Sequence, residues 1–294
     1  MKISVLEAPV NLGSPTSGSQ YAFNFLVSEG LGDILGADTR FFPMAMPLSE
    51  IKNFPSPDNM KDLDRVMGVS RTLCSSVKDE ILNGRFPIII GGDHSCAIGS
   101  IAGASAVYGA DETSVIYIDG HTDINTENTT LTGYIHGMTL ASAMGLCCDE
   151  ITVGRRVNLY GKNIFIVGAR SIDPAEYGII EDENVTLYDI DEVKRRGICA
   201  VMDEIIKKIT TKHIHVSFDV DFVDGDEFPS TGYRMPCGAS FDDACLAVCR
   251  ALETGKVCSM DVVEYNPTLD DGTDRDKLFG LFEMVREQVS RYSD

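Results

Sequence analysis

The sequence of 294 residues predicts an α/β protein with one mostly parallel central sheet and helices on both faces. Two observations lead to this fold class. Short apolar runs alternate along the chain with longer stretches whose apolar residues lie three and four positions apart, which is the pattern of strands alternating with amphipathic helices. In addition, Asp and His follow directly after several apolar runs, where parallel sheets bind their ligands.

Strands are expected where mostly apolar residues follow one another in short runs. In chain order these runs are Ile3–Leu6, Pro87–Ile90, Val115–Ile118, Ile164–Val167, Val185–Tyr188, His213–Phe218 and Val257–Val263. Helical stretches separate most of the runs, so the strands are expected to be mostly parallel and covered on both faces.

Helices are expected where the apolar residues follow the helical period, with Ser, Asp or Asn near several starts as capping residues. These stretches are Asp58–Leu82, His136–Met144, Asp203–Ile209, Phe241–Leu252 and Arg275–Arg291. Residues 11–19 and 44–59 are expected to be surface loops, and loops 125–135 and 225–240 to build the substrate pocket. One domain over residues 1–294 suffices, because a chain of this length buries about three quarters of its unfolded surface.

Three short motifs contain the residues with the clearest chemical meaning. GGDHS spans residues 91–95, DGHTD spans 119–123 and SFDVD spans 217–221, each directly after an apolar run. In the first motif, His94 follows a Gly-Gly turn at the end of the predicted strand. In the other two, the acidic and His residues occupy alternate positions, so their side chains share one face of an extended chain.

Together these motifs offer two imidazoles and four carboxylates for one site. The residues are His94, Asp119, His121, Asp123, Asp219 and Asp221. Carboxylates this close repel one another unless cations neutralise them, and two divalent ions would balance the four charges. This ligand set suits Mn²⁺ and also admits Zn²⁺, Fe²⁺ or Co²⁺. None of the three motifs contains a cysteine, which disfavours a thiolate zinc site.

A single motif of this kind is more often a turn or a helix cap than a metal site. Three of them at strand ends favour the metal interpretation. His136 lies beside the second motif, whereas His213 and His215 are expected to be ordinary strand residues.

Composition restricts the partners and the compartment. The formal net charge is −20, with 45 acidic and 25 basic residues. This charge argues against nucleic acid or an anionic membrane as a partner and is compatible with a cationic substrate, although solubility alone also explains it. No signal peptide or membrane span is recognised, and nine cysteines without a C-x-x-C motif indicate reduced thiols, so a cytoplasmic protein is expected.

On these motifs the chain resembles the ureohydrolase superfamily, which includes arginase, agmatinase, guanidinobutyrase and formiminoglutamase. The resemblance spans nearly the whole length. It implies an open parallel sheet flanked by helices, two Mn²⁺ ions per subunit, and assembly as a homotrimer or homohexamer. It also implies that the first ion is held by His94, Asp119, Asp123 and Asp219, and the second by His121, Asp119, Asp219 and Asp221.

The resemblance further implies hydrolysis of a guanidinium group by a hydroxide that bridges the two ions. Asp123 would accept a hydrogen bond from the hydroxide and pass a proton to the leaving amine. His136 would exchange protons with bulk water, a role that suits an imidazole. Glu264, at the end of MDVVEYNP, would pair with the guanidinium of the substrate.

Several details favour L-arginine as the substrate, giving urea and L-ornithine. Asn125 follows the second motif, the stretch from there to His136 has the length typical of arginase, and VGARSIDPAEYG places Asp173 where arginase holds the α-amino group. Two further positions expected to bind the amino acid end are Thr132 and Tyr134.

The chain departs from the arginase pattern at three places. Tyr134 replaces Asn in Ser-Gly-Asn, Tyr233 replaces the second Thr in Thr-Gly-Thr, and Gly120 replaces Ala in the second motif, where the side chain is expected to face away from the ligands. Both tyrosines fall on groups that bind the amino acid end, so agmatine, guanidinobutyrate or hydroxyarginine remain alternative substrates. A catalytically silent family member and a deacetylase-like zinc hydrolase are further alternatives.

Overall fold

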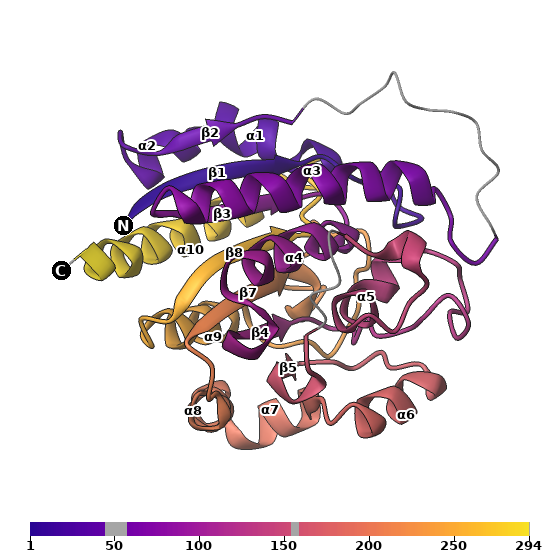
Figure 1. The fold of residues 1–294 in the computed structure, drawn as a ribbon. Helices are drawn as coiled ribbons and strands as arrows, with labels where there is room; N and C mark the ends of the chain where they lie inside the picture. The colour runs from indigo at the N-terminus through magenta and orange to yellow at the C-terminus, as the bar shows by residue number, and fades with distance from the viewer. Residues whose placement is uncertain (45–57, 154–158, 294) are drawn as a thin grey trace.

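The structure, a computed structural model, describes residues 1–44, 58–153 and 159–293. Its centre is an eight-stranded sheet with the order β2-β1-β3-β8-β7-β4-β5-β6, in which every neighbouring pair is parallel (Figure 1). The strands are β1 (Lys2–Ala8), β2 (Arg40–Phe42), β3 (Arg85–Gly91), β4 (Thr113–Ile118), β5 (Ile164–Val167), β6 (Thr186–Tyr188), β7 (His213–Asp219) and β8 (Val257–Val263).

Helices cover both faces of the sheet and form two separate apolar cores with it (Figure 1). One face carries α1 (Ala22–Ser28), α2 (Leu31–Leu35), α7 (Ile190–Arg196), α8 (Ile198–Lys208), α9 (Phe241–Leu252) and α10 (Thr273–Ser290). The other face carries α3 (Leu63–Leu82), α4 (Ala97–Tyr108), α5 (Thr139–Met144) and α6 (Pro174–Asp182). The predicted three-layer α/β fold is confirmed, and among the described residues every strand pairing is parallel.

The sheet order explains why distant motifs meet. Strands β3, β8, β7 and β4 are neighbours, so the segments that follow them leave the same edge of the sheet side by side. These are the segments that contain GGDHS, Glu264, SFDVD and DGHTD. Parallel strands end at one edge, which turns separate sequence motifs into one site.

Seven predicted strands are present, with small shifts at their ends, and β2 is the strand that sequence analysis missed. It is a three-residue edge strand with two exposed residues, too short for a recognisable pattern. Each predicted helix overlaps an observed one. The first begins at Leu63 instead of Asp58, α8 begins at Ile198, and His136 lies in a 3₁₀ turn that precedes α5.

Helices α1, α2, α4, α6 and α7 were not predicted. Helix α4 packs against the sheet beside α3 and has no polar face, so it lacks the alternation that marks a surface helix. Its Gly99 allows this close approach, because a β-carbon there would lie 2.5 Å from the carbonyl oxygen of Ser70 on α3.

The predicted surface loop 44–59 lies mostly outside the described residues, which resume at residue 58. Loop 11–19 is described and is partly buried, since Gly13 contacts the first motif through its N–H, which donates to Asp93 Oδ2 at 2.8 Å. Within the described ranges, no helix has the length and apolarity required to cross a bilayer.

Candidate metal centre

The structure places all six predicted ligands at one edge of the sheet. His94 begins a 3₁₀ turn after β3, and Asp119 to Asp123 follow β4. Asp219 ends β7, and Asp221 lies in the next turn. Five of the six side chains are buried, and His121 is partly exposed.

The first cluster surrounds Nδ1 of His94. This atom lies 2.9 Å from Asp119 Oδ2 and 3.1 Å from Asp219 Oδ2. Asp123 Oδ2 is slightly farther away, at 3.4 Å. His94, Asp119 and Asp123 form one of two groups in the described chain whose ligand atoms lie close enough to hold a common ion.

The second cluster surrounds Nδ1 of His121. It lies 3.0 Å from Asp221 Oδ2 and 3.5 Å from Asp119 Oδ1, and these three residues form the other group that could hold an ion. Asp119 therefore belongs to both clusters, with one carboxylate oxygen directed to each imidazole. Backbone N–H groups hold two of the other carboxylate oxygens, since Gly120 donates to Asp221 Oδ1 at 3.0 Å and Asp221 donates to Asp219 Oδ1 at 2.8 Å.

Burial makes this arrangement costly without a cation. It raises the pKa of Asp219 well above its usual value, and it raises that of Asp221 as well. The pKa of Asp123 rises to about 7 through burial and the nearby charge of Asp119. Carboxylates in this state must be protonated or neutralised by a positive ion.

Two buried atoms in the centre of the site have no hydrogen-bond partner among the described residues. They are His94 Nδ1 and Asp119 Oδ2, which face each other. Two lone pairs at this distance need a proton or a metal ion between them. The donor set of imidazole nitrogen and carboxylate oxygen fits a divalent transition metal.

The family model described as "Arginase family" matches residues 2–281. The arginase of Schizosaccharomyces pombe is 32% identical over 278 residues, which is 91% of this chain and 85% of that protein. The arginase of Bacillus subtilis is also 32% identical, over 281 residues and 91% of each chain. The chain belongs to the arginase family. It is therefore a hydrolase of the ureohydrolase type.

Solved structures of family members have the same fold. The crystal structure of Entamoeba histolytica arginase in complex with L-ornithine matches with a TM-score of 0.89 and 29% identity, over 97% of both chains. Arginase from Bacillus caldovelox matches with a TM-score of 0.89 and 27% identity, over 100% of this chain and 99% of that one. The resemblance to the ureohydrolases is thus confirmed for the family and for the fold.

Two further residues predicted from the arginase-family resemblance lie beside the clusters. Glu264 follows β8, and its Oε1 accepts the backbone N–H of His94 at 3.0 Å and lies 3.6 Å from His136 Nδ1. Its other oxygen, Oε2, is buried and has no hydrogen-bond partner in the part of the chain that the structure describes. Asp123 and Glu264 both have positive φ angles, 45° and 63°, which non-glycine residues adopt at a cost of about 1–3 kcal/mol each.

The residues predicted to bind the substrate lie on the loops that follow two of the ligand motifs and at the start of α6, and we call these five residues the rim: Asn125, Thr132, Tyr134, Asp173 and Tyr233. Asp173 caps α6, and its Oδ2 accepts from Asn125 Nδ2 at 2.9 Å. The Tyr233 ring lies 5.6 Å from the ring of His121 and 5.3 Å from that of His136. Tyr134 lies 6.3 Å from the ring of His136. The two tyrosine rings therefore lie beside the imidazoles of His121 and His136, and Asp173 is joined to Asn125.

Thr132 is the rim residue that the structure does not connect to the others. Its side chain is exposed, and its hydroxyl accepts the backbone N–H of Tyr134 at 3.3 Å, within the same loop. Among the described contacts, none links this hydroxyl to the carboxylates. Its predicted role rests on the resemblance alone.

One prediction about the second motif is wrong. A β-carbon at Gly120 would not face away from the ligands, because it would lie 2.9 Å from Asp221 Oδ1 and 2.5 Å from Arg170 Nη1. Arg170 cannot easily move away, since it donates to the carbonyl oxygens of Asp221 at 2.6 Å and Pro236 at 3.1 Å. Glycine at this position gives room to an arginine that supports the second cluster.

Sequence reasoning missed two residues that hold the ligands in place. Tyr117 donates to Asp123 Oδ2 at 2.7 Å, and its ring stacks on His94 at 4.4 Å. It lies two residues before Asp119, so the strand period already placed it on the ligand face. Glu176 accepts the N–H of Ile124 at 3.0 Å and that of Asp173 at 2.7 Å, which ties the rim to the second motif.

The two strand histidines differ from each other. His213 stacks on Tyr108 at 3.5 Å near the surface, as an ordinary strand residue can. His215 is fully buried, and its Nε2 lies 2.9 Å from Asp261 Oδ2. Unlike an ordinary strand residue, it therefore forms a buried pair with a carboxyl group.

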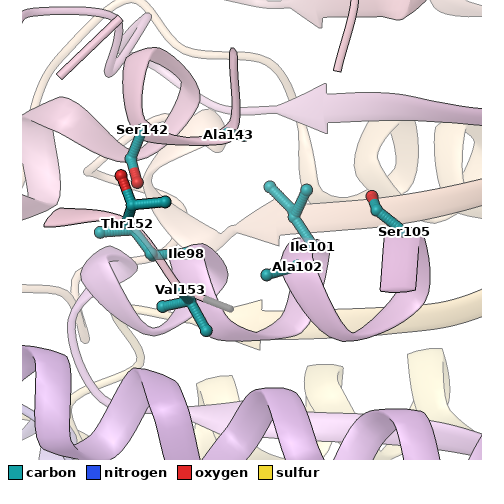
Figure 2. A pocket seen from close by; sticks show the side chains of 8 residues that line it. All are labelled: Ile98, Ile101, Ala102, Ser105, Ser142, Ala143, Thr152 and Val153. Carbon is teal, nitrogen blue, oxygen red and sulfur yellow. The ribbon is translucent and has the colours of Figure 1, made fainter. Parts of the chain in front are cut away.

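A small cavity elsewhere in the molecule is not the substrate site. It lies between α4 and α5, has a volume of about 20 Å³, and is lined by eight residues that include Ser105, Ser142 and Thr152 (Figure 2). Among the described residues that line it, none has a carboxylate or an imidazole. This volume accommodates about one water molecule, which could satisfy the buried Ser105 hydroxyl.

Proposed function

We propose that this arginase-family member is a binuclear manganese amidinohydrolase that converts L-arginine into urea and L-ornithine. The observation that carries the proposal is the pair of clusters that share Asp119. Its Oδ2 and Nδ1 of His94 are buried, and neither has a hydrogen-bond partner within the described ranges. A relative with the same fold binds L-ornithine, the expected product.

The two ions would be held by six residues. The first would bind His94, Asp119, Asp123 and Asp219, and the second would bind His121, Asp119, Asp219 and Asp221. Four carboxylate charges match two divalent ions, and this donor set suits Mn²⁺, although other divalent metals could bind. When bound, such ions lower the pKa of water toward neutrality and so supply a nucleophile.

The side chains near the clusters would bind the guanidinium and move protons. Glu264 Oε1 accepts a backbone N–H, and Oε2 is buried with no partner among the residues that the structure describes. Oε2 would therefore accept the guanidinium N–H groups. Asp123 would pass a proton to the leaving amine. His136 is partly exposed and lies beside Glu264, so it can exchange protons between the site and the solvent.

The amino acid end of the substrate would bind the rim. Asp173, oriented by Asn125, would accept the α-amino group, and Thr132, Tyr134 and Tyr233 would surround the rest. Tyr134 and Tyr233 place aromatic rings where arginases usually carry Asn and Thr. Agmatine, which lacks the α-carboxylate, guanidinobutyrate, which lacks the α-amino group, and hydroxyarginine are therefore the alternative substrates that Tyr134 and Tyr233 leave open.

A substrate panel tests the proposal. The purified protein, loaded with Mn²⁺, should release urea from arginine faster than from agmatine or guanidinobutyrate, and Asp173→Asn should raise the KM for arginine. If guanidinobutyrate, which has no α-amino group, is the substrate, Asp173→Asn should barely change its turnover. No urea from any member of the panel, or less than one bound ion per chain, would refute the amidinohydrolase and favour the silent alternative.

The assembly and compartment follow from the same proposal. We expect a single domain over residues 1–294 that assembles into a homotrimer or homohexamer in the cytoplasm. Light scattering after size-exclusion chromatography measures the assembly, and a monomeric mass for the active protein would refute it.

A further inference from the structure

A second polar cluster lies buried directly behind the metal centre. Its members come from β7, β8 and α4, and all are fully buried: Ser100, His215, Ser217, Ser259 and Asp261. The register pairs His215 with Ser259 and Ser217 with Asp261 on adjacent strands. Because paired residues point to the same face of a sheet, the side chains form one continuous network.

Asp261 is the centre of this network. Its Oδ1 accepts from the Ser217 hydroxyl at 2.5 Å, and its Oδ2 accepts from the Ser100 hydroxyl at 2.5 Å and contacts His215 Nε2 at 2.9 Å. His215 Nδ1 lies 2.8 Å from the Ser259 hydroxyl. Burial opposes ionisation of Asp261, but the neighbouring His215 outweighs it and lowers the pKa of Asp261. Each carboxylate oxygen faces a serine hydroxyl, and Oδ2 also faces an imidazole nitrogen, so all three neighbours can donate and the contacts fit an ionised Asp261 that only accepts hydrogen bonds.

The direction of each hydrogen bond follows from that carboxylate. Ser217 must donate its single hydroxyl proton to Asp261, so its oxygen can only accept from a second partner. That partner is His94 Nε2, at 2.8 Å. Nε2 must then carry the ring proton, which leaves the lone pair of Nδ1 directed at Asp119 and Asp219.

We propose that Asp261, held by His215, is a positioning residue that fixes the tautomer and orientation of His94 through Ser217. The inference rests on the proposed metal centre, since the tautomer matters only if Nδ1 binds an ion. Hydrogen bonds behind a ligating imidazole commonly change metal affinity by about 10–100-fold. None of the three metal motifs contains Asp261 or His215.

Two serines allow a matched comparison. Ser217 and Ser100 both donate to Asp261 at 2.5 Å, but Ser217 alone contacts His94. Ser217→Ala therefore breaks the connection to the metal centre, whereas Ser100→Ala removes an equivalent hydrogen bond and leaves the connection intact. Comparing the two variants separates positioning of His94 from the general loss of a buried hydrogen bond.

Calorimetric titration of metal-free protein with Mn²⁺ should show affinity reduced by about 10–100-fold in Ser217→Ala. Asp261→Asn should show a similar loss, and Ser100→Ala should retain the wild-type affinity. The second readout is ¹⁵N NMR of the five histidines in protein loaded with diamagnetic Zn²⁺. In the wild type, the Nε2 atom of His94 should carry the proton.

The outcomes separate this inference from the function. Equal affinities in Ser217→Ala and Ser100→Ala, or a proton on Nδ1 of His94 in the wild type, would overturn the role of Asp261 and leave the metal centre standing. A wild-type protein that binds no ion would overturn the metal centre itself. If Asp261→Asn does not fold, the serine pair and the NMR spectrum still decide the question.

Discussion

The ligand cluster and the rim of the candidate site are built in different ways. The ligand cluster consists of the six residues His94, Asp119, His121, Asp123, Asp219 and Asp221, which lie at strand ends and are mostly buried. The rim consists of Asn125, Thr132, Tyr134, Asp173 and Tyr233, which lie on loops and at the start of α6. The tyrosine departures from the arginase pattern fall in the rim. We infer that the ligand cluster determines the reaction and that the rim determines the substrate.

Loss of a shared ligand should give the largest effect. Asp119 reaches both imidazoles, so Asp119→Asn should release both ions. Activity should fall by roughly 10³-fold or more, because metal ions supply several kcal/mol to the transition state. Atomic absorption and urea release measure the two quantities. Asp173→Asn is the rim control and should keep its ions; equal metal loss in both variants would break the division between ligand cluster and rim.

A change in the rim should alter the substrate preference and not the metal content. Tyr233→Thr restores the residue usual in arginases and removes a ring that packs against His121 and His136. The ratio of kcat/KM for arginine to that for agmatine should rise by about 10–200-fold. Tyr177→Thr is the matched control, since Tyr177 is exposed on α6. A Tyr233→Thr variant that loses its ions would show that this tyrosine belongs to the ligand cluster.

Gly120→Ala tests whether the backbone beside the ligand cluster tolerates a side chain. The methyl group of Gly120→Ala should push against Arg170 and Asp221 and cost about 1–3 kcal/mol of stability, with weaker binding of the second ion. Urea denaturation and metal titration measure both effects. By contrast, Gly178→Ala on α6 has open space around the new methyl group and should stabilise the helix by up to about 1 kcal/mol. Equal unfolding free energies of Gly120→Ala and Gly178→Ala would show that a methyl group at position 120 does not clash with Arg170 and Asp221.

The smallest effect is expected at the outer rim. Thr132 is exposed and its hydroxyl contacts its own loop, so Thr132→Ala should change the unfolding free energy by no more than about 0.5 kcal/mol. The KM for arginine should change less than it does in Asp173→Asn. A larger KM effect at Thr132 would mean that loop 125–135 moves onto the substrate.

Sequence reasoning found the site because strand ends are easy to recognise. Each ligand follows an apolar run or alternates with apolar residues, and parallel strands bring such ends together without further information. The same reasoning could not foresee the clash at Gly120, because Arg170 is 50 residues away in the chain and its contact depends on the path of loop 221–236.

Buried polar residues were harder to interpret than buried ligands. His215 and Ser217 occupy ordinary strand positions, and their importance depends on Asp261 of the neighbouring strand, which the register of β7 and β8 places opposite Ser217. Helix α4 was missed for a related reason. An element that is buried on every side shows neither a polar face nor a clear period in the sequence.

The positive φ angles of Asp123 and Glu264 have a consequence for protein engineering. Both residues hold conformations that glycine adopts freely, so the functional side chains are retained at the expense of stability. A glycine at either position would relax the backbone while removing a group proposed to act on the substrate. Selection for thermal stability alone would therefore favour inactive variants at these two positions, and a stabilisation programme for this protein has to include an activity screen.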